Sequence, residues 1–238
     1  PVKIQYDLNR AAHIGFSVFQ YNLCKSQPEL MKAYFKNEAR KNLPKGYDID
    51  KHFTPKYNPW DERVCAVPDG DLFDVLSNGK ASIITDHIEK LTEDGILLKS
   101  GQKLKADIII TATGLELQMI GGIEPYIDGK KYNAEEGMIY KGMMIKDLPN
   151  FGFILGYTNA SWTLKADLVA AYFCRLINET EKRNKDYFVA QSDQELEKEP
   201  AIDFTSGYIK RAIESGKLPS QGTSYPWKLK QNFLVDAV

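Results

Sequence analysis

Residues 57–63 (YNPWDER) of this 238-residue chain have the residue types that most clearly suggest chemistry. The stretch combines aromatic residues and a proline with charged side chains. Its last residue, Arg63, is a permanent cation that could stabilise a developing anion such as a peroxide or an oxyanion. The simpler alternative is a surface ion pair between Arg63 and Asp61 or Glu62, which would contribute little stability. Taken alone, these residues favour the ion pair.

A second candidate begins where a short apolar run ends. Residues 106–111 (ADIIIT) are typical of a strand buried on both faces, and they lead directly into the sequence ATG at residues 112–114. A turn of small residues at the carboxyl end of a buried strand lets the backbone approach a ligand closely. A plain tight turn explains the same residues equally well.

A third candidate precedes an amphipathic helix expected over residues 164–178. Four hydroxyl or amide side chains crowd the start of that helix: Thr158, Asn159, Ser161 and Thr163. Unpaired N–H groups and the positive end of the helix dipole would suit a partly anionic ligand edge, such as the pyrimidine end of a reduced flavin. Ordinary N-capping by Ser161 or Thr163 is the alternative.

Helices are expected to frame these candidates. Residues 11–43 predict two helices broken near Pro28, where Ser26 and Glu29 spell a capping box. Asp71 is expected to cap a short helix that runs to Leu76. A last helix is expected over residues 203–214.

Short strands and one long irregular segment complete the expected organisation. Strands are predicted at residues 81–85, 106–111 and 151–155. The turn Glu93-Asp94-Gly95 predicts a hairpin between residues 88–91 and 96–98. Residues 44–70 predict an irregular segment ordered by its aromatic side chains. Short strands combined with amphipathic helices indicate an α/β fold.

The composition excludes several classes of protein. The chain has 31 Lys and Arg against 32 Asp and Glu, so no basic excess exists for binding nucleic acid. A hydrophobic content of 43% argues against disorder, and no apolar run approaches the roughly 18 residues of a membrane span. Three cysteines without a CxxC pair argue against structural zinc or a disulfide framework. They favour a cytoplasmic setting and three buried thiols.

Four longer segments resemble class B flavoprotein monooxygenases, and more closely their Baeyer–Villiger branch. These segments are residues 52–73 (HFTPKYNPWDERVCAVPDGDLF), 106–122 (ADIIITATGLELQMIGG), 140–144 (YKGMM) and 156–169 (GYTNASWTLKADLV). The family fold has two dinucleotide-binding domains, one for FAD and one for NADPH, and this chain resembles only the C-terminal half. The resemblance implies that residues 1–112 complete the NADPH-binding domain, with a helical insert. Residues 113–238 would then form the second half of the FAD-binding domain.

The resemblance also implies roles for individual residues. Arg63 matches the family's active-site arginine, which stabilises the negatively charged flavin C4a-peroxide and then the adduct with a carbonyl substrate. The implied cofactor-binding residues are Trp60, Asp61, Thr111, Ala112, Thr113, Gly114, Asn159, Ala160, Ser161, Trp162 and Thr163. No metal ligand is implied.

The implied activity is an FAD- and NADPH-dependent transfer of one oxygen atom from O₂ into a ketone or onto the sulfur of a thioether. No GxGxxG loop occurs among the seventeen glycines, and the resemblance places both glycine-rich loops upstream of Pro1. The N-terminal half of the same enzyme is therefore the expected partner, and the chain alone is expected to be inactive. The alternatives are a non-catalytic remnant and a relative of the flavin disulfide reductases, which would need a redox cysteine pair that the sequence lacks.

Overall fold

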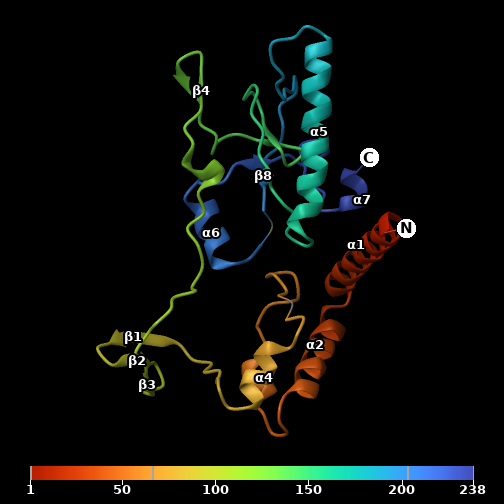
Figure 1. Cartoon of the computed structure of the whole chain (residues 1–238). Coiled ribbons are helices and arrows are strands. Elements are labelled where there is room, and N and C mark those ends of the chain that lie inside the picture. Colours follow the sequence, from red (N-terminus) through yellow and green to blue (C-terminus); the bar gives the residue numbers. More distant parts are fainter. Residues whose placement is uncertain (1, 66, 203, 238) are drawn as a thin grey trace. The chain divides into compact units, whose positions relative to one another are not determined.

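The computed structural model describes residues 2–65, 67–202 and 204–237. The chain folds into two compact units, which Figure 1 shows coloured along the sequence. Unit 1 comprises Pro1–Asn22, Trp60–Arg63 and Leu115–Val238, whereas unit 2 comprises Leu23–Pro59 and Val64–Gly114. Each unit is thus built from segments that are separated in the sequence. The division expected at residues 112 and 113, into NADPH-binding and FAD-binding parts, stays a prediction.

The first two helices form as predicted, but the first begins at Val2 rather than at residue 11. Helix α1 (Val2–Ser26) runs from unit 1 into unit 2, and α2 (Pro28–Asn42) follows it after Gln27. This confirms two helices broken near Pro28, because a proline at the first helical position lacks only an N–H that would be unpaired anyway. The expected capping box is wrong: Gln27 is the N-cap residue, and no side chain caps α2.

A small hydrophobic core holds the helices of unit 2 together. It packs α2 against α3 (Ile49–His52) and α4 (Asp71–Ser77). The buried and partly buried members are Ala39, Leu43, Tyr47, Ile49, Phe53, Phe73, Leu76 and Ile83. The short helix near Asp71 is confirmed, but Gly70 rather than Asp71 is its N-cap residue.

Unit 2 also contains a three-stranded antiparallel sheet. Strands β1 (Ile88–Thr92), β2 (Gly95–Leu98) and β3 (Lys103–Lys105) lie in that order, and Thr92 pairs with Gly95 across a two-residue turn. The predicted hairpin is therefore confirmed, and β3 is an addition to it. A Cβ atom at Gly95 would overlap the backbone of β3, so glycine is required there.

Three expected strands do not form within the described residues. Residues 81–85, 106–111 and 151–155 are irregular in the structure. Ile108 and Ile110 are 81% and 86% exposed, so the prediction of a strand buried on both faces is wrong. A strand needs a neighbour that pairs its backbone N–H and C=O groups in a continuous ladder. The described residues give these segments only isolated backbone bonds, such as the one from the Phe153 N–H to the Met143 carbonyl at 2.9 Å.

Unit 1 is organised around its longest helix, α5 (Trp162–Lys182), which confirms the helix expected over residues 164–178. Its apolar face packs against the hairpin of β6 (Ile139–Tyr140) and β7 (Met144–Ile145). The buried members of this core are Met138, Met143, Met144, Val169, Ala190 and Trp227. Trp227 contacts Tyr140 edge-to-face with ring centroids 5.1 Å apart, so the C-terminal tail packs through an aromatic residue.

Smaller elements complete unit 1. They are the 3₁₀ turn η1 (Met119–Gly122), the strand pairs β4 (Tyr126–Ile127) with β5 (Lys130–Lys131) and β8 (Glu199–Pro200) with β9 (Ser220–Gln221), and the helices α6 (Gly207–Glu214) and α7 (Phe233–Asp236). Helix α6 confirms the last predicted helix, although residue 203 lies outside the described residues. The mixture of helices and strands confirms the α/β class, and the paired strands named above are antiparallel.

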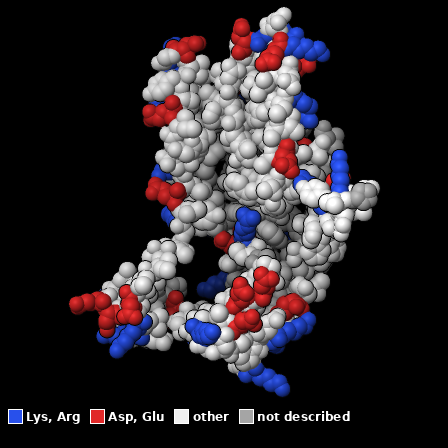
Figure 2. All heavy atoms as spheres, in the orientation of Figure 1, with Lys and Arg blue, Asp and Glu red and all other residues white. Residues whose placement is uncertain are grey.

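The surface reflects the balanced composition. On the face shown in Figure 2, basic and acidic side chains are interspersed, in agreement with a net charge of −1. In the described ranges, no helix combines the length and the apolar character that crossing a membrane requires. Cys24 is buried but Cys65 and Cys174 are exposed, so the expectation of three buried thiols is wrong for two of them.

Candidate functional site

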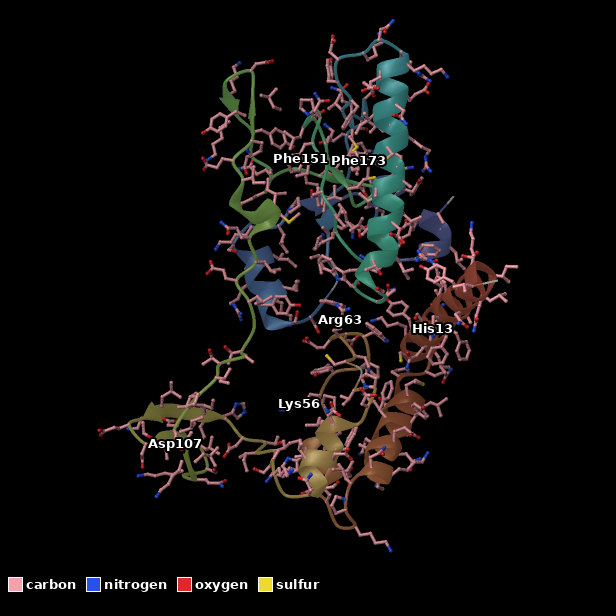
Figure 3. All side chains as sticks on the ribbon, in the orientation of Figure 1. His13, Lys56, Arg63, Asp107, Phe151 and Phe173 are labelled. Carbon is pink, nitrogen blue, oxygen red and sulfur yellow. The ribbon has the colours of Figure 1, made fainter. Side chains whose placement is uncertain are left out.

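The segment that carries Arg63 is anchored in unit 1, although the residues on both sides of it belong to unit 2. The backbone carbonyl of Asp61 accepts hydrogen bonds from the backbone N–H and the hydroxyl of Thr205, each at 3.2 Å. Trp60 packs edge-to-face against Tyr21 of α1, with ring centroids 5.7 Å apart. These contacts fix the backbone just before Arg63, whose exposed side chain is labelled in Figure 3.

Trp60 has an unusual backbone conformation for a bulky residue. Its φ of 68° lies in the left-handed region that favours glycine. Such a conformation costs on the order of 1–3 kcal/mol and persists only where the surroundings enforce it. The contacts of Asp61 and of the Trp60 ring provide that enforcement.

The loop before α5 is held by the C-terminal segment of the chain. The side-chain oxygen of Gln231 accepts hydrogen bonds from the backbone N–H of Thr158 at 3.0 Å and from its hydroxyl at 3.3 Å. The amide of Asn159 donates to the backbone carbonyl of Gln231 at 2.8 Å. These bonds fix the position of Asn159, one of the residues that the motif resemblance places beside a flavin.

The N-terminus of α5 lacks the capping expected in the simpler interpretation. Ser161 occupies the N-cap position without a side-chain capping bond, and its hydroxyl instead forms a 2.8 Å hydrogen bond with the hydroxyl of Thr163. Trp162 is 50% exposed and lies over Gly156, where an added Cβ atom would overlap its ring. The Leu164 N–H donates to the Ser161 carbonyl at 3.2 Å, and no side chain of the N-cap residue bonds the start of α5, which is the positive end of the helix dipole.

A buried ion pair makes a second link between α5 and the C-terminus. Lys165 Nζ lies 2.8 Å from Asp236 Oδ2, and their side chains are only 6% and 11% exposed. The hydroxyl of Tyr157 donates to the same carboxylate oxygen at 2.7 Å. The pKa of Tyr157 is raised, first because burial disfavours the phenolate and then because of its hydrogen bond to Asp236.

A cavity of about 110 Å³ opens beside this loop, within unit 1. Its walls are Ile14, Ser17, Val18, Tyr21 and Asn22 from α1, Asn159, Ala160 and Leu164, and Lys230, Gln231, Asn232 and Phe233. Sites for whole cofactors are usually about 300–1,000 Å³. This cavity is therefore too small for a whole dinucleotide, and no described loop has the GxGxxG pattern that would hold the pyrophosphate of FAD.

The remaining predicted site residues lie elsewhere. Thr111, Ala112, Thr113 and Gly114 are exposed and irregular, and they close the last segment of unit 2. The structure thus groups Trp60, Asp61 and Arg63 with the segment Asn159–Thr163 in unit 1, and leaves the residues of the ATG turn in unit 2. Among the residues that the structure describes, no cluster of His, Cys, Asp or Glu could hold a metal ion.

Sequence reasoning missed the residues that hold the loop in place, namely Gln231, Asp236, Lys165 and Tyr157. The sequence did contain a local signal for the helix α7 that carries Asp236, because Asn232 directly precedes the apolar run FLV and asparagine is a preferred N-cap residue. In the structure, the Asn232 side chain caps α7 by accepting a hydrogen bond from the N–H of Leu234 at 3.0 Å. Gln231 had no such signal, since its partner Thr158 lies 73 residues earlier.

Comparison with known proteins finds that the chain is similar to flavoprotein monooxygenases. No family model matches it, and no solved structure matches it. Several curated proteins do match along nearly its whole length, and their names confirm the resemblance to class B flavoprotein monooxygenases that the motifs carry.

Three relatives illustrate this similarity. The chain is 48% identical over 237 residues to the FAD-containing monooxygenase EthA of Mycobacterium tuberculosis, which covers 99% of this chain and 48% of that protein. It is 47% identical over 238 residues to the probable FAD-binding monooxygenase AlmA of Acinetobacter baylyi, and the match covers 99% of this chain and 47% of that protein. It is 41% identical over 239 residues to the putative FAD-containing monooxygenase MymA of M. tuberculosis, and the match covers 100% of this chain and 48% of that protein. The chain spans about half the length of the curated relatives it matches.

Proposed function

We propose that this chain is part of an FAD- and NADPH-dependent monooxygenase and provides one wall of its flavin site. The observation that carries the proposal is the identity of 41–48% with proteins named as FAD-containing monooxygenases, over 99–100% of the chain. The structure adds geometric support, because the segment Trp60–Arg63 and the loop before α5 belong to one compact unit despite the roughly hundred residues between them.

The residues around the smaller cavity are suited to the polar edge of the flavin. In the proposed site, the Asn159 amide, the Ser161 and Thr163 hydroxyls and the N–H groups at the start of α5 face that edge together with Ala160 and Trp162. Hydrogen-bond donors at a helix N-terminus favour a ligand that carries partial negative charge. Trp60 and Asp61 would line the nicotinamide side, and Thr111 to Gly114 would form the hinge between the domains.

Arg63 has the role of a fixed positive charge. Its guanidinium stays protonated, so it stabilises negative charge that develops on oxygen next to the substrate without exchanging a proton. Bound FAD would supply the redox chemistry, accepting hydride from NADPH and reacting with O₂. The proposed substrates are ketones, in a Baeyer–Villiger insertion, or thioethers, and the proposed location is the cytoplasm.

The pyrophosphate of each dinucleotide requires a binding loop that the described chain does not contain. We assign those loops to an N-terminal half of the same enzyme. The exposed side chains of Ile108 and Ile110 support this assignment, because adjacent apolar side chains that are 81% and 86% exposed favour coverage by another segment. By the same reasoning, residues 1–238 produced alone should not retain stoichiometric FAD.

The test uses the protein as the organism makes it. We expect flavin absorbance in the purified protein and NADPH oxidation that yields an ester from a cyclic ketone or a sulfoxide from a thioether. The Arg63→Ala variant should lose product formation while NADPH still bleaches the flavin. Arg183→Ala, which removes an exposed arginine that pairs with Glu179, is the matched control and should keep full activity.

Three results would contradict the proposal in different ways. Absence of bound flavin from the intact protein would overturn the function itself. Normal product formation by Arg63→Ala would overturn only the role of Arg63. A saturable yellow complex of FAD with residues 1–238 alone would refute the need for a second half.

A further inference from the structure

A second cavity, of about 340 Å³, lies in unit 1 along α5, C-terminal to Leu164, the residue of this helix that lines the smaller cavity. Its α5 wall includes Lys165, Leu168, Tyr172 and Arg175, whose spacings of three and four residues place them on one face of the helix. The other walls are Lys141 and Met143 at the β6–β7 hairpin, Tyr225, and Asp236 and Ala237 at the C-terminal end. The cavity therefore joins four separate segments of unit 1.

The charges around this cavity are unbalanced. Lys141, Lys165 and Arg175 contribute three cations, whereas Asp236 is the only carboxylate in its wall among the described residues. That carboxylate is already occupied, because it accepts hydrogen bonds from Lys165 and Tyr157. Within the described residues, no carboxylate lies within ion-pair distance of Lys141 or Arg175. Among the described residues, these two positive charges thus have no counter-ion.

Aromatic rings hold one of these cations in place. Lys141 Nζ lies 5.2 Å from the ring centroid of Tyr172 and 5.3 Å from that of Tyr225. Such contacts stabilise an ammonium without neutralising its charge. Arg175 follows Tyr172 by one turn of α5, and its planar guanidinium can donate two parallel hydrogen bonds to a carboxylate or a phosphate.

We infer that this cavity binds a small organic anion. A carboxylate or phosphate monoester group contacts Arg175 and Lys141, and a compact apolar body lies against Met143, Leu168 and Leu176. A volume of about 340 Å³ is enough for a ligand of that size. The Lys165–Asp236 pair forms a neutral part of the wall, so it does not supply the charge for binding.

The test measures binding of three probes by isothermal titration calorimetry, using the protein as the organism makes it. Benzoate and phenyl phosphate present the two anionic groups, and benzamide presents the shape of benzoate without the charge. We expect at least one anion to bind at least about tenfold more tightly than benzamide, which corresponds to one charge-assisted hydrogen bond. The anion that binds more tightly identifies the preferred head group.

Two variants locate the site. Arg175→Met and Lys141→Met should each weaken the binding of the anion by about tenfold or more, because each removes one of the uncompensated charges. Arg183→Met, at the C-cap of the same helix and outside the cavity, should leave the affinity unchanged. If thermal unfolding shows that Arg175→Met does not fold, Lys141→Met alone decides the question.

The inference is independent of flavin binding and of oxygenation, so each can fail without the other. Failure of both anions to bind at about 10 mM would overturn it, since a built site should exceed millimolar affinity. Equal affinity for benzoate, phenyl phosphate and benzamide would also overturn it. Unchanged affinity in a folded Lys141→Met variant would do the same.

Discussion

The side-chain oxygen of Gln231 accepts a hydrogen bond from the backbone N–H of Thr158 at 3.0 Å, and this contact spans 73 residues of sequence. With the bond from Asn159 to the Gln231 carbonyl, it fastens the loop before α5 to the C-terminal segment. The position of the candidate flavin-facing residues therefore depends on a segment that has no chemistry of its own. Gln231 is a positioning residue in this interpretation.

Replacing Gln231 by alanine removes the acceptor for Thr158. We expect the free energy of unfolding to fall by about 1–2 kcal/mol, because a partly buried N–H loses its partner. Hydrogen exchange at Thr158 should become faster. Gln231→Glu keeps an acceptor oxygen and should cost less. The exposed Gln102→Ala is the control, and an equal effect in Gln102→Ala and Gln231→Ala would contradict the positioning role.

The buried Lys165–Asp236 pair should respond strongly to the loss of one partner. Asp236→Leu leaves the Lys165 ammonium buried without a carboxylate, so we expect a loss of about 3–5 kcal/mol in the free energy of unfolding. The double variant Lys165→Met with Asp236→Leu should lose less than Asp236→Leu alone. The exposed pair of Arg183 and Glu179 gives the reference, and Glu179→Ala should cost less than about 1 kcal/mol in urea unfolding.

Two glycines in unit 1 leave room for large side chains of α5. A Cβ atom at Gly156 would overlap the ring of Trp162, and one at Gly152 would overlap the ring of Phe173, which Figure 3 labels. Alanine at either position should lower the free energy of unfolding by about 1–3 kcal/mol through overpacking. Gly15→Ala, inside α1 with open space around it, should instead stabilise the protein by about 0.5–1 kcal/mol. Equal destabilisation by all three variants in thermal denaturation would refute this explanation.

Asp86 should contribute a pH-dependent part of stability in unit 2. Its pKa lies below the ordinary value because the carboxylate accepts hydrogen bonds from Ser100 and from the backbone N–H of His87, the latter at 2.6 Å. The contribution is present above the pKa of the unfolded chain, about 4, and is lost as the pH falls through the lower native pKa. The stability difference between wild type and Asp86→Asn should shrink over that acidic window. An NMR titration that found the ordinary pKa for Asp86 would contradict the expectation.

The helices and the hairpin were predictable because their signals are local. Apolar residues at helical spacing marked α1, α2 and α5, and the turn before Gly95 marked the pairing of β1 with β2. The strand predicted at residues 106–111 does not form, because an apolar run becomes a strand only when a neighbouring strand exists to pair with it. The described chain provides no such neighbour, and Ile108 and Ile110 stay exposed.

The candidate site was predictable only in part, for a related reason. Its motif residues, such as Arg63 and Asn159, could be named because they lie within recognisable continuous segments. Gln231 and Asp236 could not, because a hydrogen bond across about 70 residues leaves no periodic or compositional trace in the sequence. Such contacts become visible only when the fold brings the segments together.

The interleaving of the two units constrains the order in which the molecule is made. The ribosome has synthesised all of unit 2 once it passes Gly114, whereas unit 1 still lacks its third segment at that stage. Because domains form as units while the chain emerges, the first helix and the residues around Arg63 have to wait for partners such as Thr205. A nascent chain terminated before Thr205 would carry the arginine but lack the residue that anchors its segment, so only translation products that extend past Thr205 can assemble this site.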